Sequence, residues 1–321
     1  MTIDTLSKAP TFADPADNGN HAPEADHYWQ ESSLFTWHDE ATRSGGMYRL
    51  GIHPHRGTAS IYTWTVIDGE FADRRFLWGQ PLPAGEITGM AIGGVTVSTV
   101  EPMADYRVDV QAGELDMSFR WRPYIPPMMH VLSTPGSGAQ LAKGHYNTMG
   151  RAEVSGTFRG KALNIVGGGG FMDHSWGKRQ GIPLGTRWLY ASFGPDFCIM
   201  VLQNMTEFGC TVKASYVIRD GRVIPLSSDT RIHMIVSDDA YSPEGCHAVI
   251  HDVEGNIYHV EGRIVTPTSV YPWANSFLTH GTARFECDGR VGEGMLECSN
   301  NFQGPPAWEM ETLDLAPGTV F

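Results

Sequence analysis

The densest group of reactive side chains lies near the middle of the 321-residue sequence, in the run Gly170-Phe-Met-Asp-His-Ser-Trp-Gly-Lys178. This short run combines a carboxylate, an imidazole, a hydroxyl, an indole and an ammonium group. Three more glycines, Gly167 to Gly169, precede it. Because glycine has no Cβ, such a run can adopt positive φ and pass close to other groups. We therefore expect the glycines to form a turn that leads into a functional site.

The four residues Asp173 to Trp176 divide into two pairs. Successive side chains of an extended chain point to opposite faces, so His174 and Trp176 would share one face, and Asp173 and Ser175 the other. The Asp-His-Ser string is therefore not a catalytic triad. His174 is a candidate acid or base, Asp173 its orienting or proton-relay partner, and Trp176 a pocket wall that can stabilise a cation. In the alternative, Asp173 and Ser175 bond loop N–H groups and Trp176 belongs to the core.

A second candidate group follows in Arg187-Trp-Leu-Tyr190, where alternation predicts a strand. Arg187 and Leu189 would share one face of this strand, and Trp188 and Tyr190 the other. Arg187 either anchors a substrate oxygen or forms a structural ion pair, and both interpretations remain open. We place Tyr190 among the catalytic candidates as a proton donor. Trp188 and Tyr146 join Arg187 and Trp176 among the candidate substrate-binding residues.

Aromatic and polar side chains also gather near the two ends of the strand-rich region. Trp29 and Glu31 lie close together near the start, and Trp273 lies in Tyr271-Pro-Trp near the end. Each of the three is a candidate for binding substrate. The same residues equally fit core aromatics and a polar partner for them.

Metal and nucleotide sites are disfavoured. His53 and His55 put two imidazoles on one side of an extended chain, but no third ligand is specified nearby. The five cysteines include no Cys-x-x-Cys pair, so a reduced, cytoplasmic setting fits best. The glycine run is not followed by the Gly-Lys-Ser/Thr of a phosphate loop. We expect neither a metal nor a cofactor.

The overall charge excludes some partners. A formal net charge of -13 would repel phosphate backbones, so we expect no nucleic-acid partner. No apolar run approaches the roughly 20 residues that a membrane helix needs, so we expect no stable membrane insertion. The first 26 residues have neither the basic start nor the apolar stretch of a secretory signal.

The pattern after residue 26 is that of an all-β protein. The segment Cys210–Arg219 alternates, with Val212, Ala214, Tyr216 and Ile218 on one face, which is typical of a half-buried strand. Hairpin turns are predicted where Asp-Gly or Glu-Gly separates two strand patterns, at 68–69, 220–221, 254–255 and 288–289. No stretch of ten or more residues has a clear helical stripe. We predict antiparallel sandwiches or barrels, which can enclose a hydrophobic ligand.

Three segments are expected along the chain. Residues 1–26 would be a polar leader that packs on the surface. Residues 27–165 would form one β domain, and residues 166–321 a second one that carries the central motif.

Several short motifs, taken in order, resemble the AttH/CrtC-like superfamily, the relatives of carotenoid 1,2-hydratase (hydroxyneurosporene synthase). They are Trp29-Gln-Glu-Ser32, Gly45-Gly-Met-Tyr-Arg-Leu-Gly-Ile-His-Pro54, His145-Tyr146, Gly170-Phe-Met-Asp-His-Ser-Trp-Gly-Lys-Arg179 and Gly281-Thr-Ala-Arg-Phe-Glu286. The resemblance covers nearly the whole chain, and Asp-His-Ser-Trp-Gly is its most specific part.

The resemblance implies two consecutive lipocalin-like β-barrels and cofactor-free acid–base chemistry on isoprenoid-like substrates. The family's proposed catalytic His and Trp would correspond to His174 and Trp176. We therefore expect a cofactor-independent hydratase, lyase or isomerase that acts on a hydrophobic, terpenoid-like or polycyclic small molecule. Two alternatives are a pericyclase or terpenoid cyclase on the same fold, and a non-catalytic binder of hydrophobic ligands.

Overall fold

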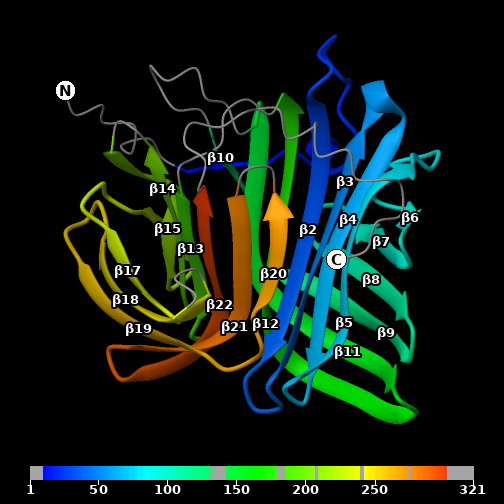
Figure 1. Ribbon diagram of the computed structural model, residues 1–321. Helices are drawn as coiled ribbons and strands as arrows, with labels where there is room; N and C mark the ends of the chain where they lie inside the picture. Colours follow the sequence, from blue (N-terminus) through cyan, green and yellow to red (C-terminus); the bar gives the residue numbers. More distant parts are fainter. Residues whose placement is uncertain are drawn as a thin grey trace. The chain divides into compact units, whose positions relative to one another are not determined.

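The computed structural model describes residues 10–130, 132, 142–178, 185–206, 209–238, 242–273 and 276–301. These residues form antiparallel strands and two short 3-10 helices, and the described ranges contain no α-helix. The prediction of an all-β fold is therefore confirmed (Figure 1). Within the described part of the chain, no helix is long and apolar enough to cross a membrane.

The chain forms two compact units, comprising mainly Phe12–Gly181 and Ile182–Met310. The division expected after residue 165 falls inside one continuous strand, β12 (Lys161–Lys178), so the central motif belongs to the first unit. The glycine run lies within this strand rather than in a turn. Gly167 alone of the run has a positive φ, of 82°. A Cβ on Gly170 would lie 2.5 Å from the carbonyl oxygen of Thr36, so this glycine permits close strand contact.

The first unit contains a 12-stranded sheet in the order β5-β4-β3-β2-β12-β11-β9-β8-β7-β6, to which β10 and β1 are added through β11. Its elements are β1 (Thr11–Phe12), η1 (Pro15–Asn18), β2 (Trp29–Asp39), β3 (Ser44–His53), η2 (Pro54–Arg56), β4 (Thr58–Ile67), β5 (Glu70–Pro81), β6 (Ala91–Ile92), β7 (Val95–Glu101), β8 (Asp105–Ala112), β9 (Leu115–Pro123), β10 (Met128–His130), β11 (Gly144–Phe158) and β12.

The second unit contains a 10-stranded sheet in the order β16-β15-β14-β13-β22-β21-β19-β18-β17, with β20 paired to β21. Its strands are β13 (Gly185–Ser192), β14 (Phe197–Thr206), β15 (Gly209–Arg219), β16 (Arg222–Pro225), β17 (Arg231–Val236), β18 (Pro243–His251), β19 (Ile257–Ile264), β20 (Ser269–Trp273), β21 (Ser276–Cys287) and β22 (Arg290–Asn301).

Both sheets share one connectivity. In each, a first long strand begins a series of hairpins, and the last strand of the unit returns to pair with it: β12 with β2, and β22 with β13. The predicted hairpin turns are present between β4 and β5, β15 and β16, β18 and β19, and β21 and β22. Asp-Gly suits these turns because both residues adopt positive φ, as at Asp68 (53°) and Gly69 (82°).

The alternation predicted for Cys210–Arg219 is interrupted. Ala214 has a φ of 49°, and the pairing of β15 with β14 shifts register nearby. Val212 and Val217 consequently pack on the same core, although their odd spacing in a regular strand would place them on opposite faces.

The core of the first unit explains why the site lies where it does. Trp29, Phe35 and Trp37 on β2 and Met172 and Trp176 on β12 belong to one buried hydrophobic cluster. By alternation, Glu31 of β2 and His174 of β12 point to the same side as these residues. Charged groups are unfavourable among apolar side chains unless they are paired. Glu31 and His174 therefore need polar partners in this position.

Candidate functional site

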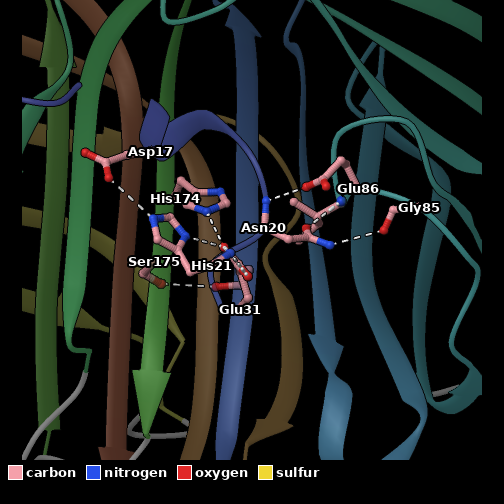
Figure 2. A network of polar contacts seen from close by, with 10 residues as sticks. Asp17, Asn20, His21, Glu31, Gly85, Glu86, His174 and Ser175 are labelled. Carbon is pink, nitrogen blue, oxygen red and sulfur yellow. Dashed lines mark hydrogen bonds and ion pairs between the residues drawn. The ribbon is translucent and has the colours of Figure 1, made fainter. Parts of the chain in front are cut away.

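The centre of the site is a contact between strands β2 and β12. Glu31 lies opposite Trp176 in the strand register, and His174 lies opposite Ser33, so Glu31 and His174 are diagonal neighbours on one face. Glu31 Oε1 lies 2.9 Å from His174 Nε2, within hydrogen-bond distance. Both residues are buried, at 0% and 1% exposure. A carboxylate and an imidazole that are 143 residues apart in sequence therefore form one buried pair (Figure 2).

A second imidazole reaches Glu31 from the segment that precedes β2. His21 Nδ1 lies 2.7 Å from Glu31 Oε1, and the His21 backbone N–H donates to Glu31 Oε2 at 2.9 Å. The other ring nitrogen of His21, Nε2, lies 3.4 Å from Asp17 Oδ1. Figure 2 shows the resulting chain of contacts from Asp17 through His21 and Glu31 to His174.

Polar contacts on both sides of His21 hold this segment. The Asn18 side chain donates to Thr99 Oγ1 at 3.0 Å. The Asn20 side chain donates to the carbonyl oxygen of Gly85 at 3.1 Å, and its backbone N–H donates to Glu86 Oε2 at 2.5 Å. Residues expected to form a loose surface leader thus place an imidazole within the site.

Aromatic rings flank both imidazoles. The His21 ring stacks on the Trp176 indole, with centroids 3.6 Å apart and planes 6° apart. The Tyr146 ring of β11 stacks on His174, with a centroid distance of 5.3 Å and an angle of 16°. These contacts restrict rotation of both imidazoles, so their nitrogens stay directed at Glu31.

The two imidazoles determine the charge of the carboxylate. Burial alone would raise the pKa of Glu31, but its hydrogen bonds to His174 and His21 outweigh this effect and hold the pKa below its ordinary value. Glu31 is therefore ionised at neutral pH. Burial also raises the pKa of Tyr146 well above its ordinary value, so its hydroxyl stays protonated. The hydroxyl of Tyr106, another buried tyrosine, donates to Asn18 Oδ1 at 2.6 Å.

The structure brings together four of the sequence-predicted residues: His174, Trp176, Tyr146 and Glu31. Trp29 lies on the same strand as Glu31 and belongs to the hydrophobic core.

Asp173 does not join the group. It is paired with Leu34 and Asn147 across the sheet, and alternation places it on the face of β12 opposite to His174. Ser175 shares that face and forms a hydrogen bond of 3.1 Å with the hydroxyl of Ser32. The carboxylate that contacts His174 is therefore Glu31.

The remaining candidates belong to the second unit. Arg187 donates to the carbonyl oxygen of Ser299 at 2.9 Å and to Asn300 Oδ1 at 2.9 Å. The rings of Trp188 and Tyr190 are 5.5 Å apart on β13. Trp273 ends β20, and its side chain lies outside the described residues.

Two residues of the site, His21 and Asp17, have no signal in the sequence. They lie among prolines, alanines and acidic residues without a strand pattern, and only the folded chain shows their proximity to Glu31. His53 Nε2 contacts Ser60 Oγ, and His55 Nε2 contacts the carbonyl oxygen of Glu24.

Among the described residues, His21, Glu31 and His174 are the group whose donor atoms lie close enough to hold a metal ion, all within 4.8 Å of one another. Two imidazoles and a carboxylate are suitable zinc ligands. However, Glu31 Oε1 lies at hydrogen-bond distance from both nitrogens, so the carboxylate itself fills the space between the imidazoles.

Two solved structures share the fold of this chain. Kievitone hydratase from Nectria haematococca superimposes with a TM-score of 0.60 at 11% identity, over 93% of this chain and 97% of that one. The crystal structure of CghA with Sch210972 gives a TM-score of 0.60 at 15% identity, over 92% and 97% of the two chains. At these identities the likeness establishes the fold alone. No curated protein matches the sequence significantly. A family profile described as "Domain of unknown function (DUF7064)" matches residues 14–302, so the chain belongs to the DUF7064 family.

Proposed function

We propose that the protein is an enzyme that exchanges protons with a hydrophobic small molecule without a cofactor, as a hydratase, lyase or isomerase. The observation that carries this proposal is the buried contact of 2.9 Å between Glu31 Oε1 and His174 Nε2. Buried ionisable pairs are retained at a cost in desolvation, and they concentrate at functional sites. The fold shared with a protein named kievitone hydratase is consistent with this chemistry.

In this mechanism His174 is the acid and base, and Glu31 is its orienting partner. An ionised carboxylate bonded to Nε2 stabilises the imidazolium form, which lets His174 accept and return a proton. Because Nε2 is directed at Glu31, we assign proton exchange with the substrate to Nδ1. The ring faces of Tyr146 and Trp176 can stabilise positive charge on His174 or on the substrate.

The charge state of Glu31 narrows the substrate class. Protonation of an isolated alkene favours a neutral carboxylic acid with a raised pKa. Glu31 has a lowered pKa and is ionised. An imidazolium is a weaker acid, and it suits alkenes whose protonated form delocalises its positive charge onto a conjugated phenol or carbonyl oxygen. We therefore favour terpenoid-like or polycyclic substrates that carry such an oxygen beside the reacting double bond.

Hydration by this mechanism returns His174 to its starting protonation state. His174 gives a proton to one alkene carbon, and a water oxygen bonds to the cation left on the other. The excess proton of that water returns to His174, so no proton is consumed beyond the added water. Elimination follows the same steps in reverse.

The experiment incubates the purified full-length protein with kievitone and with a panel of terpenoid alkenes, in water and in D2O, followed by mass spectrometry. A hydratase produces a gain of one water, and an acid–base isomerase produces an isomer that carries solvent deuterium. His174→Ala should reduce either rate by about 10²–10⁴-fold. A cyclisation that depends on shape alone would give an isomer without deuterium and would survive His174→Ala, and binding without turnover would indicate a binder; either result refutes the acid–base proposal.

A further inference from the structure

We infer that Asp17 and His21 form a proton relay that connects the buried pair Glu31 and His174 to solvent. This inference rests on the proposed function, because a relay is needed only if His174 exchanges protons. It assigns a role to two residues of the segment before β2.

The contacts form an unbroken chain of exchangeable groups. Asp17 Oδ1 lies 3.4 Å from His21 Nε2, His21 Nδ1 lies 2.7 Å from Glu31 Oε1, and the same oxygen lies 2.9 Å from His174 Nε2. Imidazole can accept a proton at one nitrogen and release one at the other. His21 is therefore placed to receive a proton on its Asp17 side and release it on its Glu31 side.

Exposure falls along this chain as a relay requires. The side chain of Asp17 is 27% exposed and that of His21 is 19% exposed, whereas those of Glu31 and His174 are 0% and 1% exposed. Solvent thus reaches the outer two groups and not the inner two. His174 has a path to water through His21 that consists of hydrogen-bonding atoms only.

The orientation of His21 is fixed for this role. Its ring lies against the Trp176 indole at 3.6 Å, and its backbone N–H donates to Glu31 Oε2. Neither contact uses the two ring nitrogens, so both remain directed at Asp17 and Glu31. A residue that served only to neutralise Glu31 would not need a second nitrogen directed at a partly exposed carboxylate.

The transfer is balanced at each atom. The proton on His21 Nδ1 moves to the ionised Oε1 of Glu31, and the same proton then moves on to Nε2 of a His174 ring that is protonated at Nδ1 only, which gives the imidazolium. His21 Nε2 takes a proton from Asp17 or from water beside it, so the His21 ring is left protonated at Nε2, and transfer in the reverse direction restores its first tautomer. One proton enters from solvent for each proton that reaches His174, and the relay runs equally in reverse.

The test measures exchange of the His174 imidazole N–H with water by NMR, in protein labelled with ¹⁵N-histidine, and needs no substrate. His21→Gln keeps a hydrogen-bonding side chain of similar size but cannot pass a proton between two nitrogens. We expect exchange at His174 to become at least about tenfold slower, in line with the size of general acid–base effects. Addition of free imidazole to His21→Ala should restore the rate by occupying the vacated space.

Asn20→Ala is the matched control, because it loosens the same segment without touching the relay. Exchange in this variant should be unchanged or faster, so slowing in His21→Gln reports the relay itself. Unchanged or faster exchange in His21→Gln overturns the relay. That outcome leaves the proposed function intact if His174→Ala still abolishes turnover, so the two proposals fail separately.

Discussion

The imidazole of His21 lies flat against the indole of Trp176, with ring centroids 3.6 Å apart and planes within 6° of each other. His21 comes from an irregular segment and Trp176 from the strand that carries the central motif. The stack therefore joins a segment with no strand pattern to the most reactive part of the sequence. It also means that the site is incomplete without residues that precede the first long strand.

Replacement of His21 should weaken the first unit. His21→Ala removes the stack and leaves the buried Glu31 with one imidazole partner, which should lower the free energy of unfolding by about 1–3 kcal/mol. His21→Phe keeps a ring against Trp176 and should lose less. Urea denaturation of both variants measures the difference, and equal losses would show that the stack contributes nothing.

Removal of the negative charge of Glu31 should reduce the activity of the protein. Glu31→Gln keeps the size of the side chain but cannot stabilise an imidazolium at His174, so turnover should fall by about 10²–10⁴-fold. Asp173→Asn, on the opposite face of β12, should have a smaller effect. If Asp173→Asn abolishes turnover and Glu31→Gln does not, the partner of His174 is Asp173.

The same Glu31 variant should change how stability depends on pH. The pKa of Glu31 in the folded protein lies below its ordinary value of 4.5. Its ionised form therefore contributes stability above pH 4.5, and this contribution is lost as the pH falls through the folded pKa. The stability difference between wild type and Glu31→Gln should shrink on acidification in this window. A constant difference from pH 7 to pH 3 would contradict the assignment.

His38 should make the protein sensitive to acid. Burial lowers its pKa from 6.5 to about 3, so the folded protein keeps it neutral while the unfolded chain becomes protonated. Stability should fall as the pH drops from 6.5 towards 3, by up to about 1.4 kcal/mol per pH unit from this group. His38→Phe should flatten the decline in a pH series of denaturation curves. An unchanged slope would mean that other groups cause it.

Two glycines of the central run should respond differently to alanine. A Cβ on Gly170 would lie 2.5 Å from the Thr36 carbonyl oxygen and 2.7 Å from Trp121 Nε1, so Gly170→Ala should cost about 1–3 kcal/mol through crowding. A Cβ on Gly167 would meet nothing within 4 Å, and only the positive φ of 82° opposes it. Gly167→Ala should therefore cost less, about 1 kcal/mol. Urea midpoints of the two variants provide the comparison.

Local features of the sequence were sufficient to predict the strands and half of the residues of the site. Asp-Gly pairs mark the hairpins because few other residues adopt positive φ twice in succession. Alternation correctly puts His174 and Trp176 on one face, and their rings are 5.6 Å apart. The same alternation places Asp173, the direct neighbour of His174, on the other face of β12.

The rest of the site depends on long-range pairing that no local pattern encodes. Glu31 meets His174 only because β12 returns to pair with β2. His21 reaches the site because its segment is held by contacts of Asn20 to Gly85 and Glu86, which lie 65 and 66 residues further along the chain. The glycine run was predicted to form a turn, because glycine allows one. In the structure, the missing side chain of Gly170 instead allows β12 to approach the Thr36 backbone.

The return of β12 to β2 has a consequence for the timing of folding. The contact between Glu31 and His174 closes a loop of 143 residues, and such distant contacts form slowly because the chain must first lose much of its freedom. During synthesis, Glu31 leaves the ribosome long before His174 exists. The nascent chain therefore carries Glu31 among core side chains without its His174 partner, until the last strand of the unit arrives. Because His174 lies on β12, the last strand of the first unit, the sheet of this unit can be completed only after His174 has been synthesised.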